Sequence, residues 1–502
     1  MNPADHAGDK NSARIALGLI LFVTLLQSAW NVLRVPALTG YDEPGHLAYV
    51  LTIVREARLP HPLAGWSTFH PPVYYALASL LWRVAEPMGP YPLLIAVRSI
   101  GVAAALLSGA AAFLLVRRQG SNVATATVAT LLVVFVPFRQ IATTMIGNEA
   151  LAAAVVALAL LSLVDLQRDP RRLGNALVAG GLTGLALGTK YTAFALLPAC
   201  VIPFLRVDLG SRGLRAAGVC ALAIALVAGP IYARNLALTD ALIPMTRGLE
   251  PMHSIEQGYA LRPRHASDYL YVPWGIFRNP SVAGQSLDGI PVSGFSVKKD
   301  GQTLEVGGTV VNRNMLSVAG LVYAGVWWDP FEVRVPPRLH AEGAHLGTVL
   351  TLLGVIPTLV AMAGFLVASW RMLATRFRVR QAPVTAFAWC ALGLFVVFTW
   401  KAPSLAAAKA SYLLPVGVPA AVFFSEGIAV LMPRLRSVAL AASLVAALAC
   451  AVAFTDGVLF ASRPAHPLTV ALWTRISAFL PGEHIDEAVR MIGMVPVVNG
   501  AP

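Results

Sequence analysis

The chain has 502 residues, of which 57% are hydrophobic and only 13% charged, and its formal net charge is +13. Soluble proteins carry about 25% charged residues, so this deficit, with many apolar runs near 20 residues, predicts a protein that crosses a membrane many times. The positive charge does not indicate nucleic-acid binding, because Lys and Arg fall in short clusters between apolar runs, as membrane topology requires. Four cysteines, Cys200, Cys220, Cys390 and Cys450, lie inside apolar runs without metal-ligand spacing, which predicts small buried side chains.

The first apolar run, about residues 15–33, lacks a small-residue cleavage site and predicts a retained signal anchor with a cytoplasmic N-terminus. Ten further spans are predicted at about 91–116, 121–137, 149–166, 173–189, 191–205, 215–233, 346–369, 383–400, 408–432 and 436–456. The apolar stretch at 71–84 is short for a crossing and is assigned as a re-entrant or interfacial helix. With that choice Arg117, Arg118 and every later arginine cluster between spans face the cytoplasm, as the positive-inside rule expects.

The expected fold is therefore an all-α polytopic bundle of about 11 transmembrane helices. Residues 1–233 form an N-terminal transmembrane catalytic module that includes the first outer loop, 34–90. Residues 234–345 form a small mixed α/β outer segment, 346–456 the C-terminal transmembrane helices, and 457–502 an outer tail with a weakly amphipathic piece at 468–480. In the outer segment, 295–306 predicts two short strands around an Asp-Gly turn, and 315–328 predicts an interfacial helix with Trp327 and Trp328 at headgroup depth.

Directly after the first span, the run Gly40-Tyr41-Asp42-Glu43-Pro44-Gly45-His46 places two carboxylates and an imidazole at the water edge of the membrane. Ionisable groups beside a bilayer lose solvation energy, so they usually mark a functional site. The alternative is that the two acids only cap the helix that begins near Pro44, where carboxylates suit the helix dipole. We favour a functional site, because one cap residue would suffice and here a charged pair stands beside a histidine. A second proline-fixed helix start follows at His70-Pro71-Pro72-Val73-Tyr74-Tyr75.

Further polar residues lie at the outer ends of predicted spans, level with Asp42. They are Asn148, Glu149, Lys190, Tyr191, Tyr232, Arg234, Asn235, Trp400, Lys401, Lys409, Ser411 and Tyr412, while Arg139, Arg262, Arg264 and His265 lie in outer loops. Any one of them could be an interfacial anchor, and Arg139 and Trp400 fit that role best. As a set, the acids at 42, 43 and 149 and the cations at 190, 401 and 409 suit a reaction that needs a base and holds an anionic leaving group.

With these motifs in this order, the chain resembles a GT-C superfamily glycosyltransferase of the protein O-mannosyltransferase and aminoarabinose transferase type. The resemblance rests on the two motifs that open the juxtamembrane helices and on Asn148-Glu149-Ala150, Gly188-Thr189-Lys190-Tyr191 and Lys409-Ala410-Ser411-Tyr412-Leu413-Leu414-Pro415. It implies transfer of a sugar from a polyprenyl phosphate to an acceptor on the extracytoplasmic face. It also implies that Asp42 is the candidate base, that Glu149 positions acceptor or donor, and that Thr189-Lys190 faces the lipid phosphate.

The chain departs from that pattern in two places. The aminoarabinose transferases begin their second juxtamembrane helix with a Glu-Lys-Pro run, whereas this chain has Phe69-His70-Pro71, so one phosphate-contacting cation is missing. The long outer segment at 234–345 also lies between spans where those enzymes carry a shorter loop. Both departures bear on the identity of the acceptor.

The predicted site has three groups of residues. The candidate catalytic residues are Asp42, Glu43 and Glu149; the candidate donor and phosphate-binding residues are Lys190, Tyr191, Arg234, Lys401, Lys409 and Tyr412; the other site residues are His46, His70, Asn148, Arg262 and Arg264. No cofactor is expected beyond the polyprenyl-phosphate sugar donor, although Asp42, Glu43, His46 and His70 could ligate a divalent cation. The expected partners are the membrane, that donor and a protein, lipid or glycan acceptor, and no nucleic acid. The expected location is the inner (cytoplasmic) membrane, with the active site outside the cytoplasm.

Three other functions stay open. A lipid-linked glycan polymerase or ligase would also carry a large outer loop and would use arginines there, such as Arg262, Arg264, Arg313 and Arg334. A secondary transporter would place charges near the bilayer midplane and show inverted repeats, whereas here the charges lie at span ends and no repeat is visible. A homologue that only binds its ligand is the third, and the intact Asp42-Glu43 pair disfavours it.

Overall fold

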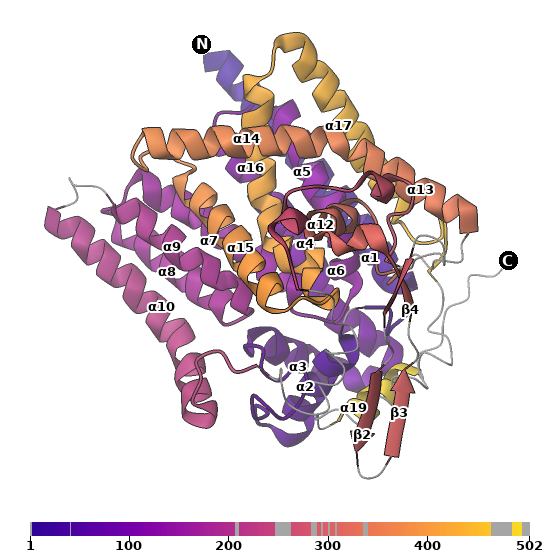
Figure 1. Cartoon of the computed structure of the whole chain (residues 1–502). Helices are drawn as coiled ribbons and strands as arrows, with labels where there is room; N and C mark the ends of the chain where they lie inside the picture. The colour runs from indigo at the N-terminus through magenta and orange to yellow at the C-terminus, as the bar shows by residue number, and fades with distance from the viewer. Residues whose placement is uncertain are drawn as a thin grey trace.

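A computed structural model describes residues 3–40, 42–205, 210–245, 263–282, 289–292, 295–299, 302–306, 309–334, 340–462 and 484–493 (Figure 1). Most of them form a helical bundle. Its helices are α1 (Pro3–Arg34), α4 (Pro90–Arg118), α5 (Val123–Phe135), α6 (Pro137–Thr144), α7 (Glu149–Arg168), α8 (Leu173–Leu187), α9 (Leu196–Val201), α10 (Gly210–Thr239), α13 (His340–Leu353), α14 (Val355–Ala374), α15 (Ala382–Lys401), α16 (Gly417–Val430) and α17 (Pro433–Ala453). Four short 3-10 turns adjoin these helices. Helix α9 lies between η2 (Tyr191–Ala195) and η3 (Ile202–Phe204), while η8 (Ala406–Ala408) and η9 (Ala410–Val416) lie between α15 and α16.

The predicted polytopic bundle is confirmed. Among the described residues, eight helices are long and apolar enough to cross a membrane, and the bent pair α5–α6 would be a ninth. The predicted spans at 173–189 and 191–205 are also helical, but as shorter apolar pieces at Leu173–Leu187 and Tyr191–Phe204. Small residues allow close packing in this bundle: an added Cβ at Gly364 of α14 would collide with the backbone of α16, and one at Gly427 of α16 with the backbone of α14.

The third predicted span is broken rather than straight. The chain bends by 53° between α5 and α6, at Val136, because Pro137 cannot continue the preceding helix and instead starts a new one. Residues 138–147 were expected to form an outer loop, and this expectation is wrong for Pro137–Thr144, which is helical and buried throughout. The bend turns the chain back into the protein before the Asn148-Glu149 pair begins α7.

Two juxtamembrane helices lie at one end of the bundle, the end opposite the N-terminus (Figure 1). They are α2 (Glu43–Glu56) and α3 (Val73–Ala85), with η1 (Glu86–Met88) after the second. An apolar core separate from that of the bundle holds them against the start of α4, and it contains Leu47, Tyr75, Trp82 and Val97. The short C-terminal helix α19 (Ile485–Gly493) adds Ala488 to the same core. Two helices of about four turns cannot bury enough surface alone, so this shared core fixes their orientation.

The segment predicted to lie outside, 234–345, contains two small antiparallel pairs of strands among its described residues. Strand β1 (Gly289–Val292) pairs with β4 (Thr309–Asn312), and β2 (Phe295–Lys299) pairs with β3 (Gln302–Val306). The second pair confirms the hairpin predicted at 295–306. Short turns η4 (Ala266–Tyr269), η5 (Trp274–Phe277) and η6 (Arg313–Leu316) surround helix α12 (Val318–Trp327).

Trp327 and Trp328, predicted to lie in an interfacial helix at headgroup depth, do not face lipid headgroups. Both side chains are buried within the protein, at 4% and 2% exposure. The indole N–H of Trp327 donates to the hydroxyl of Thr358 on α14, and the Trp328 ring packs edge-on against Phe454. A large apolar ring gains more from complete burial in a protein core than from the interface, so α12 serves as a packing helix.

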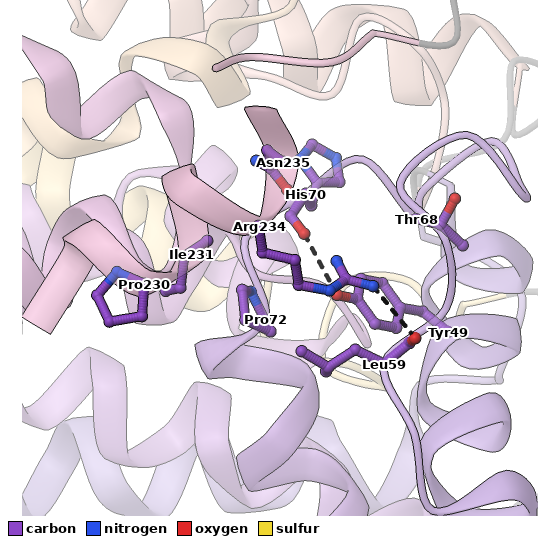
Figure 2. A pocket seen from close by; sticks show the side chains of 9 residues that line it. All are labelled: Tyr49, Leu59, Thr68, His70, Pro72, Pro230, Ile231, Arg234 and Asn235. Carbon is purple, nitrogen blue, oxygen red and sulfur yellow. Dashed lines mark hydrogen bonds between the residues drawn. The ribbon is translucent and has the colours of Figure 1, made fainter. Parts of the chain in front are cut away.

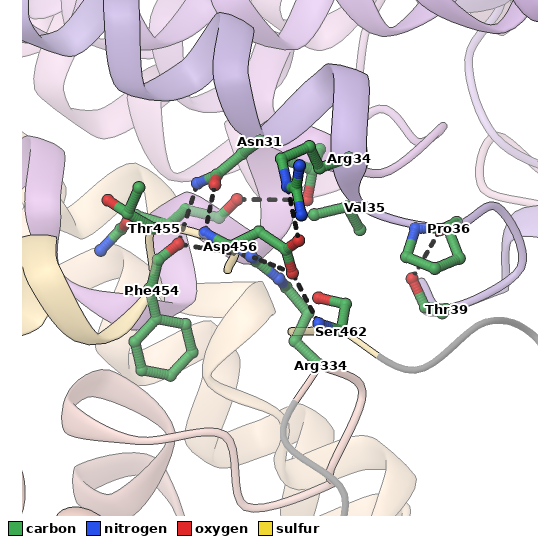
Figure 3. Close-up of polar contacts among 12 residues, drawn as sticks. Asn31, Arg34, Val35, Pro36, Thr39, Arg334, Phe454, Thr455, Asp456 and Ser462 are labelled. Carbon is green, nitrogen blue, oxygen red and sulfur yellow. Dashed lines mark hydrogen bonds and ion pairs between the residues drawn. The ribbon is translucent and has the colours of Figure 1, made fainter. Parts of the chain in front are cut away.

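A polar cluster joins the first and last helices of the bundle (Figure 3). The backbone N–H of Asp456, just after α17, donates to Asn31 Oδ1 of α1 at 2.9 Å, and Arg34 of α1 pairs with the Asp456 carboxylate at 3.4 Å. Arg334, after α12, reaches the carbonyl of Phe454 at 3.3 Å. Because these residues are far apart in the sequence, the cluster closes the bundle at the end where α2 begins.

Candidate functional site

Asp42 lies at the N-terminal end of α2 without capping it. Its backbone is left-handed (φ 57°, ψ 14°), and its side chain makes no capping hydrogen bond to the first turn. Aspartate is among the few residues that tolerate this conformation, which appears most often at turns and functional sites. The carboxylate is 48% exposed, and its nearest cation is Lys409, at 3.7 Å. The alternative that Asp42 serves only as a cap therefore has no support in this geometry.

Glu43 is buried and fully engaged. One carboxylate oxygen accepts the N–H of Gly40 and the other the N–H of Ile146, each at 2.9 Å. The guanidinium of Arg98, on α4, lies 3.6 Å from it, and both side chains are 1% exposed. Arg98 in turn donates to the carbonyls of Val35 and Pro36. Through these contacts Glu43 connects the segment after α1, the start of α4 and the turn before α7.

Glu149, the first residue of α7, pairs with Lys190, which follows α8. The Lys190 ammonium donates to Glu149 Oε1 at 2.6 Å, and the two side chains are 12% and 6% exposed. The other oxygen, Oε2, is buried without a hydrogen-bond partner. Asn148 fixes this corner, because its amide donates to the carbonyl of Thr189 at 3.2 Å. Two predicted motifs, Asn148-Glu149 and Thr189-Lys190, are therefore brought together.

The late motif reaches the same place. Lys190 lies over the ring of Tyr412, with the ammonium 5.6 Å from the ring centroid, a cation–π arrangement. Tyr412 belongs to η9, which begins directly after Lys409. The ammonium of Lys409 faces Asp42. Three acid–cation pairs, Asp42–Lys409, Glu43–Arg98 and Glu149–Lys190, thus meet at this end of the bundle, and Asp42 is the most exposed of the three acids.

His46 lies between these pairs. Its Nδ1 is 2.7 Å from the hydroxyl of Tyr75, and its ring stacks on that of His70 with centroids 5.6 Å apart. Burial lowers the pKa of His46, although the carboxylates of Glu149, Asp42 and Glu43 oppose this. The pKa of His70 is lowered well below its ordinary value by burial and then by Lys190. Both imidazoles are therefore neutral at neutral pH.

A cavity of about 230 Å³ opens beside His70 (Figure 2). Its wall includes Tyr49 of α2 and Pro230, Ile231 and Arg234 of α10. Tyr49 donates to the carbonyl of His70 at 3.5 Å, and Arg234 donates to the carbonyls of Leu59 and Pro60. Tyr191, next to Lys190, donates to the carbonyl of Phe69, so the cavity and the charged pairs share the segment before α3.

The remaining predicted residues lie elsewhere or serve the fold. Lys401 is exposed at the end of α15. Arg264 is 6% exposed and donates to the carbonyls of Leu316 and Ser404, which ties the outer segment to the turn after α15. Arg262 and Tyr41 lie outside the described residues. Arg139 was expected to be an interfacial anchor, and this is wrong: it is 1% exposed within the bundle and donates to Ser108 of α4 at 2.8 Å.

Two residues of the site were not predicted, Arg98 and Tyr75. Arg98 is the one charge of α4 that lies away from its C-terminal Arg117-Arg118, and such residues are rare enough in a bilayer to count as a signal by themselves. Tyr75 stood in a quoted motif without a role, because no spacing rule shows which of several tyrosines faces a histidine. Among the described residues, no group of three or more His, Cys, Asp or Glu side chains is arranged to hold a metal ion.

Comparisons with known proteins give one family match. Residues 69–233 match the family model described as dolichyl-phosphate-mannose-protein mannosyltransferase. That segment contains His70, Glu149 and Lys190 but begins after Asp42. No curated protein matches the chain in a sequence comparison.

Several solved structures align over most of the chain. ArnT from Cupriavidus metallidurans in the apo state is 12% identical with a TM-score of 0.49, over 88% of this chain and 76% of ArnT. The Archaeoglobus fulgidus oligosaccharyltransferase is 16% identical with a TM-score of 0.49, over 96% of this chain but only 58% of its own length. The arabinosyltransferase EmbB from Mycobacterium smegmatis has a TM-score of 0.33 over 84% of this chain and 41% of EmbB. Identities and TM-scores this low assign no function.

The family match covers the segment that supplies Glu149, Lys190 and the start of α3. Its description names a sugar transferase, which agrees with the motifs quoted from the sequence and with the polytopic bundle. Over residues 69–233, the family match therefore agrees with the predicted resemblance to the protein O-mannosyltransferases.

Proposed function

We propose that this chain transfers a sugar from a polyprenyl-phosphate-linked donor to a hydroxyl acceptor, with Asp42 as the general base. The observation that carries the proposal is the state of Asp42: it is half-exposed, makes no capping bond, and lies at the most open of the three acid–cation pairs. A carboxylate that does not stabilise its own helix is available to accept a proton. The active site would face away from the cytoplasm.

In the proposed reaction the acceptor oxygen attacks the anomeric carbon from the side opposite the phosphate, which inverts the configuration there. Asp42 takes the acceptor proton as the new carbon–oxygen bond forms. The bond from the anomeric carbon to the phosphate oxygen breaks at the same time, and polyprenyl phosphate leaves with the electron pair. Lys190 would stabilise the charge on that phosphate, since its ammonium can turn from Glu149 toward the leaving group.

The cavity beside His70 supports a lipid-linked donor. Its walls are mainly apolar, and one of them is the part of α10 that holds the exposed Pro230. Helix α10 is a membrane-span candidate with 22% of its apolar window buried in the protein, so most of it would face lipid. Isoprene units next to a phosphate at Lys190 would enter such a cavity from the bilayer. The family description, which names a dolichyl-phosphate-linked sugar, agrees with this donor class.

The polymerase or ligase alternative loses support from two of the four arginines on which it depended, whereas Arg313 is exposed and Arg262 lies outside the described residues. Arg264 and Arg334 are both buried and hold backbone carbonyls. Side chains engaged in this way are not free to bind a growing glycan. We therefore retain a single proposed function.

The test replaces Asp42 by asparagine, which keeps the size and the left-handed backbone but removes the base. Native membranes, which contain the acceptor, would be supplied with dolichyl- and undecaprenyl-phosphate mannose, and release of the polyprenyl phosphate would be measured. We expect Asp42→Asn to fold and to bind polyprenyl phosphate, but to transfer almost no sugar. The matched control is Asp240→Asn, because Asp240 has nearly the same positive φ (55°) at an exposed turn after α10. Near wild-type transfer by Asp42→Asn would overturn the proposal.

A further inference from the structure

The free oxygen of Glu149 and the Cδ2–Nε2 edge of His46 both lie close to Gly147. A Cβ atom at position 147 would lie 2.6 Å from Glu149 Oε2, 3.5 Å from His46 Cδ2 and 3.6 Å from His46 Nε2. The small glycine therefore leaves the carboxylate oxygen and that edge of the ring as near neighbours. Oε2 is buried and has no hydrogen-bond partner, while Oε1 holds Lys190. A buried carboxylate oxygen without a donor is costly, so a donor close to it is significant.

Tyr75 decides which nitrogen of His46 carries the proton. A neutral imidazole has one N–H and one lone pair, and its Nδ1 lies 2.7 Å from the Tyr75 hydroxyl. If the hydroxyl donates to Nδ1, the proton of the ring lies on Nε2, at the edge that faces Glu149. The opposite arrangement would point a lone pair at a carboxylate and is electrostatically unfavourable. Burial also raises the pKa of Tyr75, which keeps its hydroxyl protonated.

The segment around Gly147 is held from several sides, so this arrangement is preorganised. Glu43 accepts the N–H of Ile146, and the amide of Asn148 holds the carbonyl of Thr189. The Tyr75 ring is fixed as well, because it stacks on Tyr49 with centroids 3.8 Å apart. The glycine turn and the tyrosine are therefore both held in place beside His46.

We propose that Tyr75 and His46 are positioning residues for Glu149. Tyr75 holds His46 as its Nε2–H tautomer, and that N–H donates a hydrogen bond to the Glu149 carboxylate when Lys190 turns to the phosphate of the donor. This inference rests on the proposed function, since it needs a phosphate at Lys190. Without such a donor, the departure of Lys190 would leave Glu149 charged, buried and unpaired. A neutral imidazole supplies the missing hydrogen bond and adds no net charge to the site.

The experiment measures binding of undecaprenyl phosphate alone, so it needs neither sugar nor acceptor. Tyr75→Phe keeps the stacked ring and removes only the hydroxyl, and we expect its affinity to fall roughly tenfold, as for one buried group left unpaired. The His46 variants separate the two nitrogens: Gln places an amide N–H near the position of Nε2, and Asn places one near that of Nδ1. We expect His46→Gln to bind nearly as well as wild type and His46→Asn to bind as weakly as Tyr75→Phe.

The control is Tyr91→Phe, which removes a hydroxyl bonded to the carbonyl of Leu33 at the start of α4 and should leave binding unchanged. A Glu149→Gln background has no carboxylate to accept a hydrogen bond from His46. In that background, Tyr75→Phe should not weaken binding of undecaprenyl phosphate any further. Equal binding by wild type and Tyr75→Phe would overturn the inference, and so would equal weakening by His46→Gln and His46→Asn. A wild-type protein that does not bind undecaprenyl phosphate would instead refute the proposed function.

Discussion

Replacing Glu43 separates a structural acid from a catalytic one, because its neighbour Asp42 differs in every contact. Both oxygens of Glu43 accept a backbone N–H, and Arg98 lies 3.6 Å away in the same buried site. Glu43→Ala leaves the Arg98 charge without a carboxylate, which typically costs about 3–5 kcal/mol for a buried pair. It also leaves the N–H groups of Gly40 and Ile146 without their acceptors, at about 1–3 kcal/mol for each one that stays buried.

These losses are comparable with the whole stability of a typical domain, about 5–15 kcal/mol, so we expect little folded Glu43→Ala protein. Glu43→Gln also leaves Arg98 without a carboxylate, but it keeps one acceptor oxygen, and Arg98 keeps the carbonyls of Val35 and Pro36, so this variant should fold with a smaller loss than Glu43→Ala. Its transfer rate per folded molecule should remain within a few-fold of wild type, since no proton passes through this residue.

The assay combines thermal unfolding of the purified protein in detergent with the transfer assay, normalised to folded protein. Glu86→Gln is the control, since Glu86 pairs with Arg55 at the surface, where both side chains are about one-third exposed, and such pairs contribute only about 0–1 kcal/mol. Asp42→Asn should give the opposite pattern, with normal unfolding and no transfer. Wild-type stability together with lost transfer in Glu43→Gln would place Glu43 at the reacting atoms and refute the structural role.

Two further predictions concern Lys190 and Glu332. Lys190→Ala should slow transfer on the order of 100-fold or more, because one preorganised contact to a leaving phosphate lowers the barrier by about 2.7–4 kcal/mol. Normal turnover by this variant would show that Lys190 has only a structural role. Burial raises the pKa of Glu332, in the loop after α12, to about 7. The folded state therefore holds this proton more tightly than the unfolded state, so the stabilisation is greatest at acid pH and is lost as pH rises through 7. Thermal unfolding measured from roughly pH 5 to 8 should show that slope in wild type and a weaker one in Glu332→Gln, and an unchanged slope would contradict the assignment.

Much of the fold follows from the sequence alone. Runs of apolar residues near 20 in length predict helices wherever they occur, since a bilayer accepts only backbone that bonds to itself. The sequence also predicts where α2 and α3 start, after Asp42 and after Pro72. Prolines favour the first turn of a helix, and the charges there cannot enter the membrane. Turn chemistry was enough to place the β2–β3 hairpin.

The sequence also predicted that Glu149, Lys190 and Lys409 share one end of the bundle with Asp42, because topology alone assigns each span end to a side. The sequence could not show which of these cations pairs with which carboxylate. Which cation meets which carboxylate depends on how helices distant in the sequence pack side by side, and apolar periodicity does not encode that neighbourhood. The break at Val136 shows the same limit, since a proline predicts an interruption but not that the following helix turns inward.

Burial is what only the tertiary structure decided. Asp42 and Glu43 are adjacent and chemically alike, yet one is half-exposed and the other is enclosed with Arg98. Trp327, Trp328 and Arg139 look like interfacial anchors in the sequence, but neighbouring helices cover all three. A residue type determines what a side chain can do, whereas the surrounding helices determine whether water, lipid or substrate can reach it. The sequence therefore determined the membrane bundle and the set of charged groups at its end, and the packing decided which of those groups remain open for chemistry.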